Sequence, residues 1–178
     1  QCSFEDNCQG ALLADGACDD QHCCVVTTTP FSTSCINSQD FDILYNTTRA
    51  TFLRRALSTA MNSAGICHNC QAKAAFLAVA ATMTNNFRTD EAIGTESQFA
   101  DDDYKYGNSK PGDGIFYRRR GFFGLRGKTM YERVQARLPH IESLTKPESV
   151  ALIENSMQIA SSLWNNPNLM NGEFLFCA

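Results

Sequence analysis

No apolar run in this 178-residue chain is long enough to cross a membrane. The longest, Ala74 to Ala81, falls far short of the roughly 20 apolar residues that a membrane-spanning helix needs. A long basic run is missing too, and with a formal net charge of -4 the chain is not expected to bind nucleic acid. Strand-like alternation and internal repeats are also absent from the sequence, which favours a mainly α protein.

Little in the sequence predicts a metal or cofactor site. The best zinc fragment is Cys67-His68-Asn69-Cys70, and no second pair of cysteine or histidine residues follows it at ligand spacing. We therefore expect no metal and no cofactor, and a zinc site remains the competing interpretation of this fragment.

Cysteine, in contrast, is abundant. Nine cysteines in 178 residues indicate disulfide bonds and an oxidising compartment. The first 35 residues hold Cys2, Cys8, Cys18, Cys23, Cys24 and Cys35. The odd total leaves at least one thiol without an intrachain partner, so a free cysteine or a disulfide-linked dimer is an open alternative. A chain that starts at Gln1 beside cysteines is what signal-peptide removal would leave, and we expect a secreted, extracellular protein.

The cysteine distribution divides the chain into two parts. Residues 1–36 contain few residues able to build a core and are predicted to form a small Cys-rich appendage stapled by disulfides. Residues 37–178 are predicted to form a helical domain, since 43% apolar residues suffice for a globular core. The sequon Asn46-Thr47-Thr48 fits a secreted glycoprotein.

Four helices are predicted in the second part, over residues 47–62, 72–84, 128–138 and 145–164. In the first, apolar residues recur at helical spacing: Phe52, Leu53, Leu57 and Met61. The second is almost wholly apolar and is expected to be the buried central helix, and Pro139 stops the third. The fourth has the clearest start signal, because Thr145 and Glu148 are spaced as a capping box with Pro147 inside the first turn.

Residues 88–117 are predicted to be a long loop that contains the acidic run 101–103. A loop of about 30 residues inside a compact domain is usually functional or disordered. This one leads into Arg118, Arg119 and Arg120, so a cleft here would have carboxylates on one wall and cations on the other. The alternative is solvated charge on a surface loop.

Two segments resemble family 19 chitinases and their endolysin relatives. Ala75-Phe-Leu-Ala-Val-Ala-Ala-Thr-Met-Thr-Asn-Asn-Phe87 is similar to the family's buried helix, Ala-Phe-Leu-Ala-Gln-x-Ala-His-Glu-Ser/Thr-x-x-Phe. Residues 107–131 are similar to the family's Gly-Asn-Thr-Gln-Pro-Gly-Asp-Gly-x-x-Phe-Arg-Gly-Arg-Gly-x-Ile-Gln-Leu-Thr-Gly-Arg-x-Asn-Tyr. The matching positions are Gly107, Asn108, Pro111, Gly112, Asp113, Gly114, Arg118, Arg120, Gly121, Leu125, Gly127 and Tyr131. The resemblance covers about residues 45–165, up to Trp164, and implies a lysozyme-like helical domain.

The sequence departs from this family at the positions that carry out catalysis. Family members are inverting glycosidases, in which a Glu of the buried helix protonates the glycosidic oxygen and a second carboxylate activates water. Met83 occupies the position of that acid and Thr82 that of the preceding His, and a thioether has no proton to give. The second carboxylate maps onto Glu91 or, as an alternative, onto Glu96.

The second segment departs at three further positions. Gly124 and Arg126 replace the family's sugar-contacting Gln and Thr, and Arg119 replaces a glycine of a tight turn. The glycines and apolar residues that support the fold are retained, which is the pattern expected when catalysis is lost on a retained scaffold.

The resemblance therefore implies a secreted chitinase-like pseudoenzyme that acts by binding chitin, a related GlcNAc polymer or an extracellular protein. The ligand-binding residues that it implies are Tyr117, Arg118, Arg119, Arg120, Gly124, Arg126 and Tyr131. With Lys128 the arginines would present a basic face, unless acidic residues pair with them.

Two other functions stay open. An active inverting glycosidase would need a relocated acid among Glu91, Glu96 and residues 101–103, with two carboxylates roughly 6.5–9.5 Å apart. A structural or effector-type extracellular protein would be joined to a partner through the odd cysteine.

Overall fold

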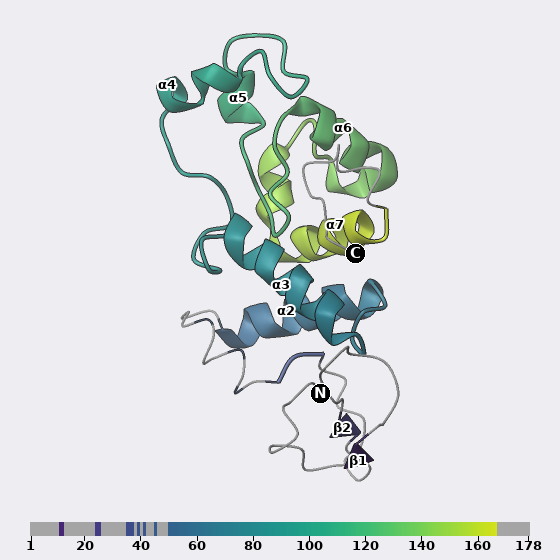
Figure 1. The fold of residues 1–178 in the computed structure, drawn as a ribbon. Coiled ribbons are helices and arrows are strands. Elements are labelled where there is room, and N and C mark those ends of the chain that lie inside the picture. Colours follow the sequence, from purple (N-terminus) through teal and green to yellow (C-terminus); the bar gives the residue numbers. More distant parts are fainter. Residues whose placement is uncertain are drawn as a thin grey trace.

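The computed structural model describes residues 35–37, 39, 41, 45 and 50–166, with the backbone of two short strands at 11–12 and 24–25. This part of the chain is mainly helical, as the sequence predicts (Figure 1). The longer helices are α2 (Ala50–Ser63), α3 (Cys70–Met83), α6 (Lys128–Arg137) and α7 (Ile153–Trp164). The shorter ones are α4 (Glu96–Phe99), α5 (Asp113–Phe116) and the 3-10 helices η2 (Ala100–Asp102), η3 (Pro139–Ile141) and η4 (Pro147–Ala151).

The Cys-rich appendage contributes one element to the described structure. Strand β1 (Ala11–Leu12) pairs antiparallel with β2 (Cys24–Val25). Strands of two residues are too short to show alternation, so the sequence pattern gave no sign of them. The sequon at Asn46 and most of the predicted appendage lie outside the described residues.

The core is built between the long helices. Helix α7 packs on α2. An aromatic contact joins α3 to the second motif segment and to the end of α7: the Phe76 ring lies 4.8 Å from that of Phe123 and 5.4 Å from that of Trp164. Helices α4 and α5 lie at the end of the molecule opposite the two strands (Figure 1).

Helix α2 confirms its prediction with one correction. Leu53, Leu57 and Met61 are at most 1% exposed, as expected for an inward stripe. Phe52, however, is 54% exposed. Because each residue advances about 100° around an α-helix, the position next to Leu53 falls on the outer side.

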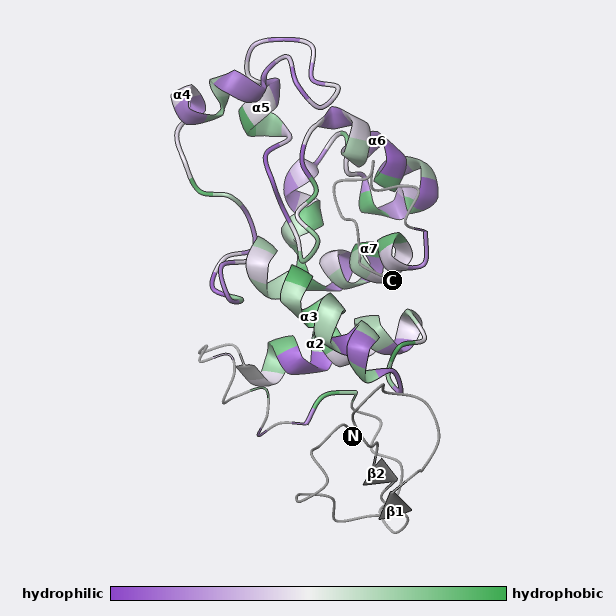
Figure 2. Cartoon of the chain, viewed as in Figure 1, coloured by the Kyte–Doolittle hydropathy of each residue, from purple (hydrophilic) through white to green (hydrophobic). Residues whose placement is uncertain are grey.

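Helix α3 has hydrophobic residues on every side, and Figure 2 colours it mainly hydrophobic. Its buried residues are nevertheless confined to one face and include Phe76, Ala80 and Ala81, whereas Ala74 and Ala78 are exposed. The prediction that this helix is buried is therefore correct for one of its faces only. The Asn69 side chain caps the start of the helix by accepting the Ala72 N–H at 2.9 Å.

Residues 88–117 are not the continuous loop that the sequence predicts. They contain α4, η2 and α5, which are fixed by hydrogen bonds between side chains and the backbone. The Thr95 N–H donates to Gln98 Oε1 at 2.7 Å, and the Gly114 N–H donates to Asp103 Oδ1 at 2.8 Å. Helical segments of about one turn have too few residues to give an apolar period, which is why the pattern did not reveal them.

The start of the fourth helix also needs correction. Thr145 does not cap a helix: its hydroxyl donates to the Glu142 carbonyl at 3.3 Å. Pro147 begins the 3-10 helix η4, and the extended Leu152 (ψ 133°) separates η4 from α7. Proline fits the first turn of either helix type, so the signal located a helical start without distinguishing the two.

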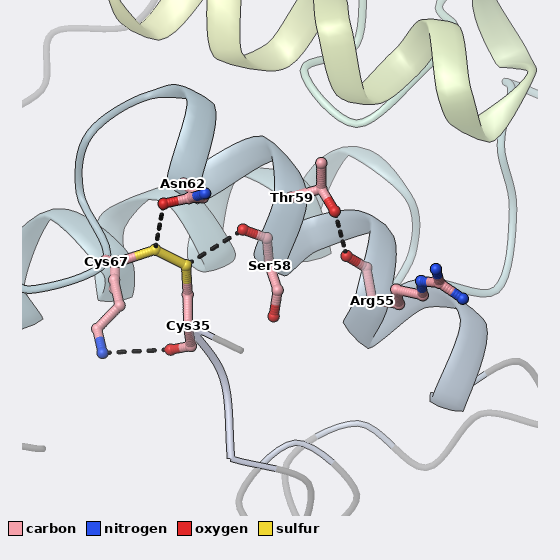
Figure 3. Close-up of a disulfide and its surroundings, with 7 residues drawn as sticks. Cys35, Arg55, Ser58, Thr59, Asn62 and Cys67 are labelled. Atoms are coloured by element: carbon pink, nitrogen blue, oxygen red, sulfur yellow. Dashed lines mark hydrogen bonds between the residues drawn. A yellow bond between two sulfur atoms is a disulfide. The ribbon is translucent and has the colours of Figure 1, made fainter. Parts of the chain in front are cut away.

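A disulfide fastens the chain before α2 to the loop between α2 and α3. It joins Cys35 to Cys67, and Cys35 Sγ lies 3.1 Å from the Ser58 carbonyl oxygen of α2 (Figure 3). Cys70 is disulfide-bonded as well. The prediction of disulfides is confirmed, and the zinc interpretation of residues 67–70 is wrong because both sulfur atoms are already bonded. In the described part of the chain, no helix has the length and apolarity that a membrane span requires.

Candidate functional site

The segment that follows α3 meets the arginine run through short stretches of paired backbone. Glu91 pairs antiparallel with Arg120, and Arg120 pairs antiparallel with Leu125. The Ala92 N–H donates to the Arg119 carbonyl at 2.8 Å, and the Gly121 N–H donates to the Asp90 carbonyl at 2.8 Å. The structure therefore brings the segment after α3 against the arginine run.

The chain reaches this pairing through an unusual turn after α3. Asn85, Asn86 and Phe87 all have positive φ values, between 50° and 61°. L-residues rarely adopt this left-handed conformation, least of all a bulky one. The Thr84 hydroxyl, which accepts the Phe87 N–H at 3.0 Å, and the near-complete burial of Phe87 hold the turn in place.

Glu91 is held by two arginines. Its Oε2 lies 2.8 Å from Arg118 Nη2 and 2.9 Å from Arg120 Nε. Burial alone would raise the pKa of Glu91, but the hydrogen bonds and positive charges of the two arginines outweigh it and lower the pKa below the ordinary value. The Glu91 carboxylate is therefore a stably ionised acceptor at neutral pH.

Arg120 belongs to the interior of the protein. Its side chain is 3% exposed, and besides Glu91 it donates to the Phe116 carbonyl at 2.8 Å and to the Tyr131 hydroxyl at 3.0 Å. The Tyr131 hydroxyl in turn donates a hydrogen bond to the Arg118 carbonyl at 2.8 Å. Burial, only partly offset by Arg120, raises the pKa of Tyr131 to about 12, so this hydroxyl remains a donor.

Tyr117 and Tyr131, both predicted to bind ligand, are core residues. They are buried and meet edge to face, with ring centroids 5.2 Å apart. The Tyr117 hydroxyl lies 3.5 Å from the Leu144 carbonyl oxygen. Tyr131 supports the arginine run through its hydrogen bonds with Arg118 and Arg120.

Arg126 makes a second acid–base contact. Its Nε and Nη2 donate to the two oxygens of Asp102 at 2.8 and 2.7 Å, and its guanidinium lies 4.4 Å from the centre of the Tyr106 ring. Lys128 lies 4.0 Å from Glu132, one turn along α6. The sequence analysis left open that acidic residues pair with the basic face, and Asp102 does so with Arg126, although the sequence did not identify this pair.

Arg119 differs from its neighbours. Successive side chains of an extended segment point to opposite faces, so Arg118 and Arg120 share the face of Glu91 and Arg119 points away from it. Its Nη1 lies 4.0 Å from Met83 Sδ. Within the described residues, Arg119 forms no ion pair.

Met83, Arg119 and Gly124 form one cluster, which we call the vacated-acid cluster. A Cβ atom on Gly124 would lie 2.6 Å from Met83 Sδ and 3.1 Å from Arg119 Cδ. Gly124 also has a φ of 60°. Any side chain at this position would displace the methionine or the arginine.

The remaining predicted carboxylates do not enter this cluster in the described contacts. Glu96 and Asp101 are exposed, on α4 and η2. Asp103 is buried and accepts the Gly114 N–H. No group of three or more His, Cys, Asp or Glu side chains in the described ranges is placed to hold a metal ion.

Comparison with known proteins adds no relative to this picture. No family model matches the chain, and no curated protein matches it.

Gly124→Ala is expected to destabilise the protein by about 2–4 kcal/mol, because the left-handed backbone costs an L-residue roughly 1–2 kcal/mol and the new methyl group adds overlap with Met83. Gly65→Ala is the matched control: Gly65 has a φ of 74°, but a Cβ atom there meets nothing within 4 Å. Urea unfolding of both variants separates strain from overlap. Equal losses in the two variants would contradict the close packing of the vacated-acid cluster.

The low pKa of Glu91 predicts a stability change in acid. The pKa is lower in the folded than in the unfolded state, so the contribution of Glu91 is complete above the ordinary value of 4.5 and is lost as pH falls through the folded pKa. We expect Glu91→Gln to flatten the loss of stability below about pH 4.5. Urea unfolding of both proteins between pH 7 and pH 3 measures the difference, and parallel curves would contradict the assignment.

Proposed function

We propose that this chain is a secreted, chitinase-like binding protein with a lysozyme-like helical domain and no glycosidase activity. Its proposed ligand is a GlcNAc-containing glycan. The two motif segments that resemble family 19 chitinases support this proposal, because they lie against each other in the folded chain. The Phe76 ring lies 4.8 Å from the Phe123 ring, and Met83 Sδ lies 4.0 Å from Arg119 Nη1.

The proposed loss of catalysis rests on the side chains at the two positions where the family has its catalytic carboxylates. Met83 has no proton to donate and its sulfur contacts Arg119. Glu91 is held ionised by Arg118 and Arg120, so it cannot replace the missing acid. General acid catalysis contributes typically about 10²–10⁴-fold in rate, and nothing described around these positions supplies it.

Relocation of the acid to the neighbouring acidic run has little support. Asp102 is committed to Arg126 through two hydrogen bonds, and Asp103 accepts a backbone N–H. Both carboxylates hold the loop between α4 and α6 in place, which is a structural role.

Binding is tested by retention on insoluble chitin, with cellulose as the control polymer and soluble chitotetraose as competitor. We expect retention on chitin that the competitor releases. Hydrogen exchange with and without chitotetraose then locates the contact, and we expect protection of residues 117–126 but not of α2. Equal retention on both polymers, or protection confined to α2, would contradict the proposal.

An extracellular protein is the second candidate ligand. It is favoured by exposed apolar side chains near α4 and α5, where Ile93, Tyr104 and Phe116 are 84%, 70% and 43% exposed. In that case Ile93→Asp would abolish capture of the partner in a pull-down from extracellular fluid and leave retention on chitin unchanged.

A further inference from the structure

Three of the positions at which the chain departs from the family come together in space. Met83, Arg119 and Gly124 lie on two separate segments, yet the Met83 sulfur contacts Arg119 and a side chain at Gly124 would overlap both. Replacement of the acid by Met83 and loss of the side chain at 124 together create room for the Arg119 side chain. The vacated-acid cluster is thus a rebuilt site that contains a cation.

Within the described part of the chain, no carboxylate forms an ion pair with Arg119. Glu91 is the nearest carboxylate along the paired backbone, but it already binds Arg118 and Arg120, and it lies on the opposite face. Arg126 is neutralised by Asp102. The arginine run therefore carries three positive charges against the single negative charge of Glu91.

The surroundings of Arg119 suit an anion. The side chain is half-buried and packed beside a thioether, which accepts hydrogen bonds only weakly. A guanidinium remains charged at every physiological pH and has a planar fork of donors that matches an oxyanion. Partial burial also reduces screening by salt, so an ion pair formed here is stronger than one on an open surface.

We propose that the vacated-acid cluster binds the anionic group of an acidic oligosaccharide, with Arg119 as the residue that recognises it. The inference rests on the proposed function, because it assumes a glycan ligand, and it deepens that function by assigning the sugar a negative charge. A uronate carboxylate and a sulfate ester share the required chemistry, an oxyanion on a sugar ring. Arg119 therefore favours an acidic sugar chain over a neutral one.

Titration calorimetry with three four-sugar probes tests the proposal. The probes are neutral chitotetraose, an alternating GlcNAc–glucuronate oligosaccharide and an O-sulfated chitotetraose. We expect at least one acidic probe to bind on the order of 10- to 100-fold tighter than the neutral one, the gain expected of a charged hydrogen-bonded pair. Which acidic probe binds tighter distinguishes carboxylate from sulfate.

Arg119→Gln is expected to remove the preference, so that the acidic and neutral probes bind this variant with similar affinity. Arg119→Lys keeps the charge without the fork and should retain part of the preference. Arg55→Gln, at an exposed arginine of α2, is the matched control and should change nothing. Thermal melts of the three variants show whether they are folded before binding is compared.

Each other outcome has a defined meaning. Equal affinity for the three probes, or the same loss in Arg119→Gln and Arg55→Gln, overturns the inference and leaves the proposed glycan binding intact. Absence of binding to all three probes overturns both the inference and the proposed glycan ligand.

Discussion

Replacing Glu91 by glutamine is expected to lower the free energy of unfolding by about 2–4 kcal/mol. The change removes the carboxylate shared by Arg118 and Arg120 and leaves the Arg120 guanidinium, 3% exposed, without a counter-charge. Breaking a fully buried pair costs roughly 3–5 kcal/mol, and we expect somewhat less because the Glu91 side chain is 36% exposed. Urea unfolding at pH 7 measures the loss.

Glu142→Gln is the matched control for this prediction. Glu142 pairs with Lys146, four residues along the chain, and both side chains are more than half exposed. Surface pairs of this kind contribute about 0–1 kcal/mol. Similar losses in the two variants would mean that the Glu91 pairs behave as surface contacts.

Removal of the Cys35–Cys67 disulfide in the double variant Cys35→Ala/Cys67→Ala is expected to cost about 3–4 kcal/mol. The bond links residues separated by 32 positions, and closing a loop of this length reduces the entropy of the unfolded chain by that amount in the chain-entropy model. Replacing both cysteines leaves no new free thiol.

The origin of this effect can be checked in the same experiment. A cross-link that acts through the unfolded state keeps that state compact, so its removal should increase the dependence of the unfolding free energy on urea concentration. A loss of stability with an unchanged urea dependence would contradict this explanation.

Helix positions were predictable from the sequence where the apolar period extends over several turns. Helices α2, α3 and α6 lie within a few residues of their predicted ranges. The one-turn helices α4 and α5 were missed because so short a segment has no measurable period. The break at Leu152 between η4 and α7 was not predicted either. Pro147 marks the start of a helix but does not show whether that helix is a 3-10 helix or an α-helix.

The composition of the arginine run was predictable, but its partners were not. Strand alternation separates Arg119 from Arg118 and Arg120 and was available in the sequence. The pairing of Glu91 with Arg120, and of Asp102 with Arg126, depends on how distant segments fold against each other. Likewise, no local pattern shows that Tyr117 and Tyr131 are buried, since aromatic residues occur both in cores and in binding sites.

Turnover of chitohexaose and of peptidoglycan by the wild-type protein tests the central claim most directly. The account predicts no products above the uncatalysed background, because Met83 cannot donate a proton and Glu91 is held ionised by two arginines. Measurable turnover by the wild type that disappears in a folded Glu91→Gln variant would contradict it, because Glu91 would then be a working catalytic carboxylate.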